Sequence, residues 1–322
     1  MSKRLTGQVA VVAGATRGAG RGIARMLGEQ GATVYCSGRS VRGKRIIKTD
    51  SPFAVEGRSE TIDETAEMVT ALGGTGIPAQ TDHSDENQVR TLFDRVRRDH
   101  GRLDILVNDI WGAEELSDHG KPFWEVDPIQ GWTMMERAVR THLITSRHGV
   151  PLMVEKKRGL VVEVTDGDHF SYRTALYYDL VKMSVIRVAF AMALELRPHN
   201  IASVAVTPGF LRSEAMLELM GVTPENWQEG AKKDPHFAHS ETPALVGRGV
   251  AALAADAEVM RWSGKVVASW TLARLYGFSD EDGRTPDWGT HFETSQEDGF
   301  PAIREEMHRA HDAYIHMGRP LK

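Results

Sequence analysis

The sequence predicts an α/β fold in which a doubly wound parallel sheet of about seven strands carries helices on both faces. Short β-branched runs alternate with longer segments of helical periodicity, and this alternation is typical of βαβ units with right-handed crossovers. Most of the short runs are continuously apolar, as expected for strands that are covered on both faces. The length of 322 residues and the 41% hydrophobic content suit one large domain with a sizeable core.

The order of the elements follows from these patterns. The predicted strands are 8–14, 32–38, 76–82, 103–109, 159–166, 201–208 and 264–270. The predicted helices are 21–30, 64–73, 86–100, 131–156, 175–197 and 243–256. Strand and helix follow one another closely enough that one sheet accommodates all seven strands.

Three segments depart from this rhythm. Residues 40–58 form a basic insertion with Gly and Pro after the second strand, and residues 210–241 form a polar loop after the sixth. We therefore expect one domain over 1–275, followed by a C-terminal extension over 276–322. The extension ends in an amphipathic helical pattern, whose apolar positions are Ile303, Met307, Ala310, Tyr314 and Met317.

Composition limits the classes of partner. The net charge of −5 and the pI of about 6.2 give no general attraction to nucleic acid or to anionic membranes. Cys36 is the only cysteine, which excludes an intrachain disulfide and fits a reducing compartment. The first residues contain no apolar stretch of signal-peptide or membrane-span length. We expect a cytoplasmic protein with no nucleic-acid or membrane partner.

A glycine-rich turn follows the first predicted strand, with the sequence Gly14-Ala-Thr16-Arg17-Gly18-Ala-Gly20. Glycines at this position permit a tight turn and let the backbone approach a pyrophosphate at the N-terminus of the next helix. The turn therefore predicts a dinucleotide site in a Rossmann-type sheet.

The residues after the second strand favour NADP(H) over NAD(H). NAD sites usually place an acidic residue there to bind the ribose 2′-hydroxyl, but this strand ends Ser37-Gly38-Arg39-Ser40. Arg39 and Arg17 would instead pair with a 2′-phosphate. The alternative is that Arg39 and Arg42 are solvated loop charges. The basic stretch 42–48 could also suggest nucleic acid, but the chain as a whole is acidic.

Tyr178 and Lys182 are candidates for acid–base chemistry. They lie at positions i and i+4 of a predicted helix and so share one face. A nearby ammonium and an oxidised nicotinamide ring favour the phenolate, which predicts a lowered pKa for the phenol. Tyr178 would then exchange a proton with a carbonyl or alcohol oxygen. The alternative is a surface pair without function. The side chain of Tyr177 should point away, and we expect it to pack.

Together these residues resemble the short-chain dehydrogenase/reductase superfamily over residues 5–275. Tyr178 and Lys182 match the family's catalytic pair, and the glycine turn matches its cofactor loop. The resemblance also assigns cofactor contacts to Asp82 with His83, Asn108, and the element Pro208-Gly209 with Ser213. Stretches 121–124, 241–248 and 264–284 are similar to the dehydrogenase/reductase member 1-like branch. The resemblance implies hydride transfer and assembly as a homodimer or homotetramer.

Thr165-Asp166 departs from the family pattern, which has serine as a hydrogen-bond donor to the substrate oxygen. An ionised Asp166 accepts hydrogen bonds only and would repel a developing alkoxide. Asp166 could be protonated, the donor could be Thr165, His169 or Ser171, or the substrate could bring the donor itself. Alternatively, Asp166 caps a turn before Gly167.

A second family residue is absent. An asparagine that holds a water near the lysine is expected on the helix after the fourth strand, where this chain has Ala138 or Val139. Thr141, His142 or bulk water could replace the relay. Unusual side chains, Asp109 and Trp111, also follow the fourth strand.

Two histidine pairs and three apolar loop residues are weaker indications of function. The pairs His236/His239 and His308/His311 have spacings that a metal could use, but neither has a third ligand, so no metal is expected. Three apolar loop residues could cover a substrate or could simply pack in the loop: Met216, Trp227 and Phe237.

The sequence thus predicts an NADP(H)-dependent oxidoreductase that acts on a carbonyl or alcohol carbon of a small molecule. Tyr178 and Lys182 are the catalytic pair, and Thr165 and Asp166 shape the oxygen site. One alternative is an imine or amine oxidoreductase that uses Asp166 as an acceptor. The other is a non-catalytic NADP-binding protein.

Overall fold

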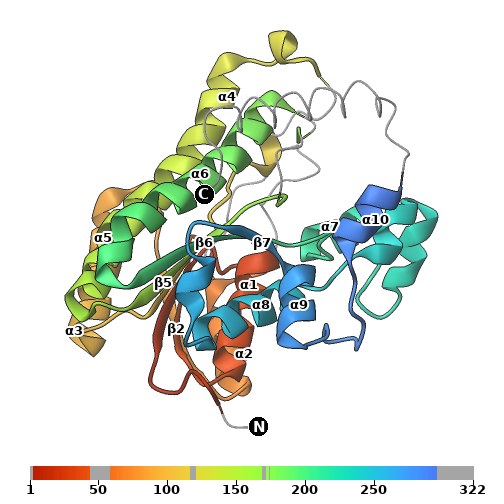
Figure 1. Cartoon of the computed structure of the whole chain (residues 1–322). Coiled ribbons are helices and arrows are strands. Elements are labelled where there is room, and N and C mark those ends of the chain that lie inside the picture. The colour runs from red at the N-terminus through yellow and green to blue at the C-terminus, as the bar shows by residue number, and fades with distance from the viewer. Residues whose placement is uncertain (1–2, 44–58, 117–120, 169–171, 174, 296–322) are drawn as a thin grey trace, which may run out of the picture.

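The computed structural model describes residues 3–43, 59–116, 121–168, 172–173 and 175–295. Its centre is one seven-stranded sheet in the order β3-β2-β1-β4-β5-β6-β7, with every pairing parallel (Figure 1). The strands are β1 Val9–Ala13, β2 Thr33–Gly38, β3 Thr75–Gln80, β4 Ile105–Asn108, β5 Gly159–Val164, β6 Ile201–Thr207 and β7 Val266–Ala268. The predicted fold class is confirmed, and the order of the strands reverses between β1 and β4.

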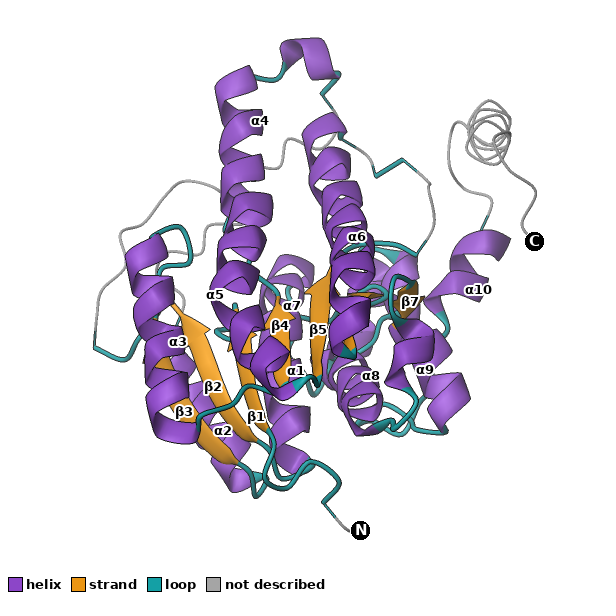
Figure 2. Cartoon of the chain, turned by 60° about the vertical axis from the view of Figure 1, so that its left-hand side comes forward, coloured by secondary structure: helices purple, strands orange, loops and turns teal. Residues whose placement is uncertain are grey.

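Helices cover both faces of the sheet (Figure 2). One layer contains α1 Gly18–Glu29, α2 Ile62–Ala71, α8 Pro243–Ala255 and α9 Ser269–Tyr276. The other contains α3 Glu86–His100, α5 Thr141–Lys156 and α6 Leu176–Leu196. α4 Pro128–Met135 continues into α5 through a π-helical segment, and with α6 it extends beyond the sheet. The short helix α7 Glu214–Met220 lies near the start of α1, where Glu214 contacts Gly18. The short helix α10 Trp288–Thr294 lies towards the β7 end of the sheet, where Gly289 packs against Trp270.

The alternation of side chains along each strand divides the core between the two layers. In β1, Val12 packs in the cluster formed with α1, α2 and α8, whereas Val11 packs in the cluster formed with α3 and α5. Both side chains are fully buried. This explains why the inner strands have continuous apolar runs: helices cover both of their faces. The edge strand β3 is less covered, and most of its side chains are exposed or half-buried.

Local signals fix the ends of the helices. Asp85 caps α3 by accepting hydrogen bonds from the backbone N–H groups of Asn87 and Gln88, and Gly101 ends the helix in the left-handed conformation. Thr242 caps α8, whose first residue is Pro243. The predicted final strand, 264–270, is shorter than expected because α9 begins at Ser269.

Two predicted features lie outside the described residues: most of the 40–58 insertion and the amphipathic pattern near the C-terminus. Among the helices that are described, none is both long and apolar enough to cross a membrane.

Candidate active site

A crevice of about 920 Å³ opens at the carboxyl ends of the strands, near the point where the strand order reverses. It brings together fourteen of the residues that the sequence predicted. They are Gly14, Thr16, Arg17, Gly18, Arg39, Asp82, His83, Thr165, Asp166, Tyr178, Lys182, Pro208, Gly209 and Ser213. Two predicted residues, Gly20 and Asn108, do not line this crevice.

The glycine turn is shaped by close backbone contacts. Gly14 has φ +92°, and a Cβ atom there would lie 2.1 Å from the carbonyl oxygen of Asp109. Gly20 also contributes by close packing, because a Cβ on it would lie 2.3 Å from the Gly14 carbonyl oxygen. At the start of α1, the N–H of Gly18 donates to Oε2 of Glu214 at 2.8 Å. A carboxylate therefore already lies at the helix end where an anion is favoured.

Asn108 does not line the crevice, where a cofactor ligand would be expected. Its Nδ2 donates to Oγ of Ser146 at 2.9 Å and to Oε1 of Glu163 at 2.7 Å. Glu163 is itself fully buried and lies 2.6 Å from Nδ1 of His142. Asn108 thus joins β4 to β5 and α5 beneath the crevice. Its contribution to the site is to hold these elements together.

Positive charge marks the side of the crevice next to β2. Arg39 is exposed at the end of β2, and its charge helps to stabilise the carboxylate of Asp82. Burial acts to raise the pKa of Asp82. Hydrogen bonds from Ser84 and the charge of Arg39 outweigh this effect, so the pKa is lowered. Arg42 points elsewhere: its guanidinium makes two hydrogen bonds of 2.8 Å to Glu67 at the surface. The alternative of a solvated loop charge therefore applies to Arg42.

His83 lies at the edge of the crevice, but its ring is buried. Nε2 lies 2.8 Å from Oγ of Ser37, and Nδ1 lies 2.8 Å from Oγ1 of Thr145. Burial lowers the pKa of His83 to about 3, so its ring is neutral. The neutral ring links β2 to α5 and offers no charge to a cofactor phosphate.

Tyr178 and Lys182 share the face of α6 that meets the crevice. The hydroxyl of Tyr178 donates to Oδ2 of Asp166 at 2.8 Å. The Nζ of Lys182 lies 5.4 Å from the centre of the Tyr178 ring and 4.3 Å from the centre of the Trp111 ring. Trp111 meets Tyr178 edge to face at 5.4 Å. These four side chains therefore form the floor of the crevice.

The chain's own groups act against the lowered pKa that the sequence predicts for Tyr178. Burial and the Asp166 carboxylate raise the pKa of Tyr178 well above its ordinary value, and Arg173 opposes them only in part. Burial is the largest cause, followed by the negative charge of Asp166. The direct hydrogen bond adds to them, because a phenol that donates to a carboxylate is stabilised in its protonated form. The sequence places Asp166 twelve residues from Tyr178 and gave no sign of this contact.

The contacts of Thr165 and Asp166 separate the roles left open by the sequence. Thr165 is buried, and its hydroxyl donates to the backbone oxygen of Lys182 at 2.8 Å. Its proton is therefore committed to α6. Asp166 directs its carboxylate at Tyr178, while the N–H of Gly167 donates to Thr207. His169 and Ser171 lie outside the described residues.

The position of the expected relay asparagine falls in the π-helical segment Glu136–Arg140. Ala138 is buried there, and the hydroxyl of Thr141 donates to the backbone oxygen of Arg137 at 2.8 Å. Both ring nitrogens of His142 have partners, one on Glu163 and the other on the Ile110 carbonyl. π-Helical turns are frequent at functional sites, and this one places Thr141 on the crevice wall.

The crevice is also lined by residues that the sequence did not assign to it. Among them are Asp234, His236 and Trp288. Trp288 begins α10 in the C-terminal extension, and a Cβ on Gly209 would lie 2.6 Å from its Cβ. Nδ1 of His236 lies 2.9 Å from Nε2 of His291, which also belongs to α10. An Asp-Pro-His run and an isolated tryptophan carry no motif, so only the folded chain identifies them.

The loop residues expected to cover a substrate divide into two groups. Met216 lines the crevice, whereas Trp227 and Phe237 are buried within the loop and pack edge to face at 6.2 Å. His239 stacks on His291 at 3.7 Å. Within the described residues, no group of three or more His, Cys, Asp or Glu side chains has the arrangement of a metal site.

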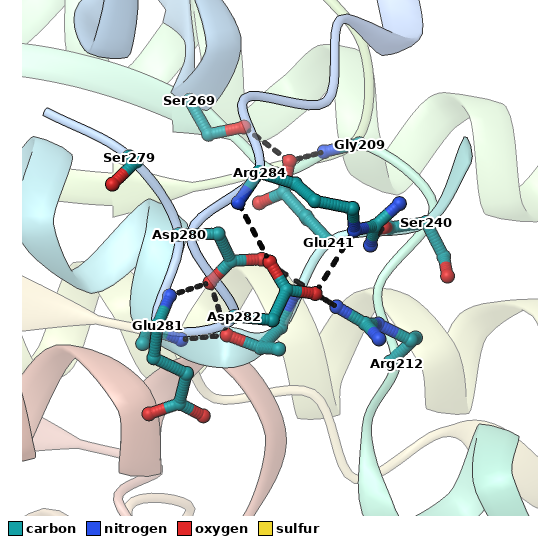
Figure 3. A network of polar contacts seen from close by, with 12 residues as sticks. Gly209, Arg212, Ser240, Glu241, Ser269, Ser279, Asp280, Glu281, Asp282 and Arg284 are labelled. Carbon is teal, nitrogen blue, oxygen red and sulfur yellow. Dashed lines mark hydrogen bonds and ion pairs between the residues drawn. The ribbon is translucent and has the colours of Figure 1, made fainter. Parts of the chain in front are cut away.

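A buried polar network joins this loop to the extension (Figure 3). Oε2 of Glu241 accepts hydrogen bonds from the N–H of Gly209 at 3.0 Å and from the hydroxyl of Ser269 at 2.6 Å. Nη2 of Arg212 lies 2.5 Å from Oδ2 of Asp282 and 3.7 Å from Oδ2 of Asp280. The network fixes Gly209, and with it the Pro208–Gly209 edge of the crevice.

Glu241 should make the stability of the protein depend on pH. Burial raises the pKa of Glu241 from 4.5 to about 8, although the hydrogen bonds from Ser269 and Gly209 act in the opposite direction. Folding therefore favours the protonated acid. Its contribution to the free energy of unfolding is greatest below about pH 4.5, falls as the pH rises towards 8 and is constant above that.

Glutamine is neutral at every pH and tests this dependence. Between about pH 5 and about pH 9, urea unfolding should show a larger loss of stability in the parent protein than in Glu241→Gln. Equal losses in the two proteins would contradict the protonated state assigned to Glu241.

Known proteins resemble this chain in both sequence and fold. The family model for short chain dehydrogenases matches residues 8–220. Dehydrogenase/reductase SDR family member 1 of Mus musculus is 37% identical over 87% of this chain and 85% of its own length. The Homo sapiens protein of the same name is 35% identical, over 88% of this chain and 86% of its own.

Solved structures agree on the fold. A short chain dehydrogenase from Mycobacterium thermoresistibile has a TM-score of 0.69 at 19% identity, over 88% of this chain and 92% of its own. A metagenomic short-chain oxidoreductase in complex with NADP has a TM-score of 0.59 at 23% identity, over 82% of this chain and 97% of its own. With the Tyr178–Lys182 floor and the glycine turn in one crevice, these matches show that the chain belongs to the short-chain dehydrogenase/reductase family of oxidoreductases.

Proposed function

We propose that the protein is an NADP(H)-dependent oxidoreductase that moves hydride between nicotinamide and the carbonyl or alcohol carbon of a small molecule. One observation carries the proposal. The hydroxyl of Tyr178 and the ammonium of Lys182 lie on one face of α6, at the floor of the same crevice that contains the glycine turn. A proton donor and a nucleotide-binding edge are thus brought to a single cavity.

The residues of the crevice fit a dinucleotide. The backbone around Gly14, Thr16 and Gly18 would hold its pyrophosphate, and Pro208 to Ser213 would border its nicotinamide. When bound, the nicotinamide supplies or accepts the hydride. For reduction, Tyr178 gives its proton to the substrate oxygen, and Lys182 lies close enough to stabilise the phenolate that remains. Oxidation reverses these steps.

Arg39 supports NADP(H) over NAD(H). Its side chain lines the crevice directly after β2, where an acidic residue would favour NAD, and Arg17 lines the same side. The two guanidiniums would pair with a 2′-phosphate by charge and by hydrogen bonding. The metagenomic relative was solved as a complex with NADP.

Arg39→Ala should weaken NADPH binding by about 10–100-fold and change NADH binding little, because a charged hydrogen bond is worth about 1.5–3 kcal/mol. Arg42→Ala is the matched control, since Arg42 pairs with Glu67 at the surface. Fluorescence titration gives both dissociation constants. An equal loss for the two cofactors would remove the role assigned to Arg39.

The substrate side of the crevice has an aromatic and partly polar lining. Trp111, Met216, Phe210 and Trp288 provide apolar surface, and His236 adds a polar group. Such a lining suits a small carbonyl or alcohol with an apolar body. Because Asp166 is an acceptor beside Tyr178, amines and imines form a second candidate class.

Assembly as a homodimer or homotetramer is also proposed. Leu143 of α5 and Leu180, Phe190 and Leu194 of α6 are exposed, with Leu194 62% accessible. Exposed apolar side chains on neighbouring helices favour burial against another copy of the chain.

The test of the proposed function is consumption of NADPH by the purified protein. The panel contains aromatic ketones, aldehydes, diketones and cyclic imines, with NADH as the comparison cofactor. Turnover with a carbonyl compound and a preference for NADPH are expected. Tight binding of NADPH without turnover of any compound would favour a non-catalytic NADP-binding protein.

A further inference from the structure

The proton of Tyr178 must be replaced once in every catalytic cycle, and this requirement rests on the proposed function. In the structure, the hydroxyl of Tyr178 donates to Oδ2 of Asp166 at 2.8 Å. A carboxylate in direct contact with a phenol can give or take the phenol's proton, whereas a serine hydroxyl at the same position could only share a hydrogen bond.

Asp166 lies between two cavities. It lines the large crevice with Tyr178, and it also lines a second cavity of about 290 Å³ on the side of the C-terminal extension. The second cavity has room for several water molecules, and its lining includes Asp168, Arg173 and Thr271. Two other lining residues, Arg274 and Thr290, are exposed, so the cavity reaches the surface.

On the side of Tyr178 that faces Lys182, the described residues provide fewer groups that could pass a proton to water. Thr165 commits its hydroxyl proton to the backbone of Lys182, and Thr141 commits its proton to the backbone of Arg137. The ring of Trp111 lies against Nζ of Lys182 at 4.3 Å. An indole ring face cannot carry a proton, so this wall of the crevice is a poor route to water.

We propose that Asp166 is a catalytic proton carrier that connects Tyr178 to solvent through the second cavity. In reduction, Tyr178 gives its proton to the substrate oxygen and becomes a phenolate. A hydronium ion or buffer acid in the second cavity then protonates the Asp166 carboxylate. Asp166 passes this proton to the Tyr178 oxygen and is a carboxylate again, so that one proton enters for each carbonyl reduced. Oxidation runs the same transfers outward.

The charges around Asp166 suit repeated transfer. Nε of Arg173 donates to the backbone oxygen of Asp166 at 3.2 Å, so one cation is held at this residue, and its charge also acts on Tyr178. Asp168 adds a negative group on the cavity wall, and the ion pair of Arg274 with Asp287 is neutral as a whole. With Tyr178 and Lys182 on the crevice side, both positive and negative groups face Asp166.

Two substitutions of Asp166 test the proposal, using the most active carbonyl compound of the panel. Asp166→Asn keeps the shape but cannot carry a proton, and Asp166→Ala leaves space for a small acid. Turnover should fall by about 10–100-fold in both variants, while the dissociation constant of NADPH changes little. Added formate or acetate should restore the rate of Asp166→Ala in proportion to the concentration of the acid form.

Asp168→Asn is the comparison variant, because it removes one carboxyl group from the lining of the same cavity and leaves the hydrogen bond of Tyr178 to Asp166 in place. It should slow turnover less than Asp166→Asn and show no response to formate. Full turnover by Asp166→Asn, or slow turnover by Asp166→Ala that no acid restores, would overturn the proposal. If the parent protein itself turns over no compound, the proposed function fails first and the proton route fails with it.

Discussion

Tyr178→Phe is expected to slow NADPH-dependent carbonyl reduction by about 10²–10⁴-fold, which is the usual contribution of a positioned proton donor. The hydroxyl of Tyr178 donates to the carboxylate of Asp166 at the floor of the crevice, and the ammonium of Lys182 lies 5.4 Å from the centre of the same ring. Phenylalanine keeps the ring and its edge-to-face contact with Trp111. The fold and the NADPH site should therefore remain, and fluorescence titration should give nearly the same dissociation constant.

Tyr177→Phe is the matched control, because Tyr177 precedes Tyr178 on α6 and packs its ring against Gly131. This variant should keep most of the activity. If Tyr178→Phe retained the rate of the parent protein, Tyr178 could not be the acid, and the proton would have to come from another group in the crevice.

Arg212→Ala is expected to lower the free energy of unfolding by about 3–5 kcal/mol, the usual cost of breaking a buried ion pair. The side chain of Arg212 is 4% exposed and lies between the carboxylates of Asp280 and Asp282. Its Cζ also lies 3.9 Å from the centre of the Trp227 ring. Without it, Asp280 keeps a buried charge next to the start of α8.

Arg261→Ala provides the comparison. Arg261 also pairs with two acids, Asp256 and Glu258, and also lies over a tryptophan ring, but its side chain is 49% exposed. Its loss should cost less than about 1 kcal/mol because water screens the pair. Urea unfolding measures both variants. Equal losses would mean that the buried network contributes no more than a surface pair.

Much of the fold could be predicted from the sequence because the signal is local. Most of the strands could be located from apolar runs, since these runs are buried on both faces and have little freedom to vary. The edge strand β3 is the exception, because most of its side chains are exposed or half-buried. The end of the last strand was misjudged because residues 266–270 read as one apolar run, and the cap that starts α9 has no side-chain hydrogen bond.

The site was predicted only where its residues belong to short motifs. Tyr178 and Lys182, four positions apart, share a helix face by geometry alone, and the glycine turn needs no tertiary contact to be recognised. The contacts that decide the chemistry are different. The bond of Tyr178 to Asp166 depends on how β5 and α6 meet, and the approach of Trp288 to Gly209 spans about eighty residues of chain. No local pattern contains either contact.

Hydride transfer within this crevice, assisted by the proton of Tyr178, is the central proposal. The most direct measurement uses NADPH that carries deuterium at both C4 positions of the nicotinamide, with mass spectrometry of the alcohol formed from a ketone. One deuterium on the carbinol carbon is expected with the parent protein, and almost no labelled alcohol is expected with Tyr178→Phe. Consumption of NADPH without label in the alcohol, or equal labelling by the two proteins, would contradict it.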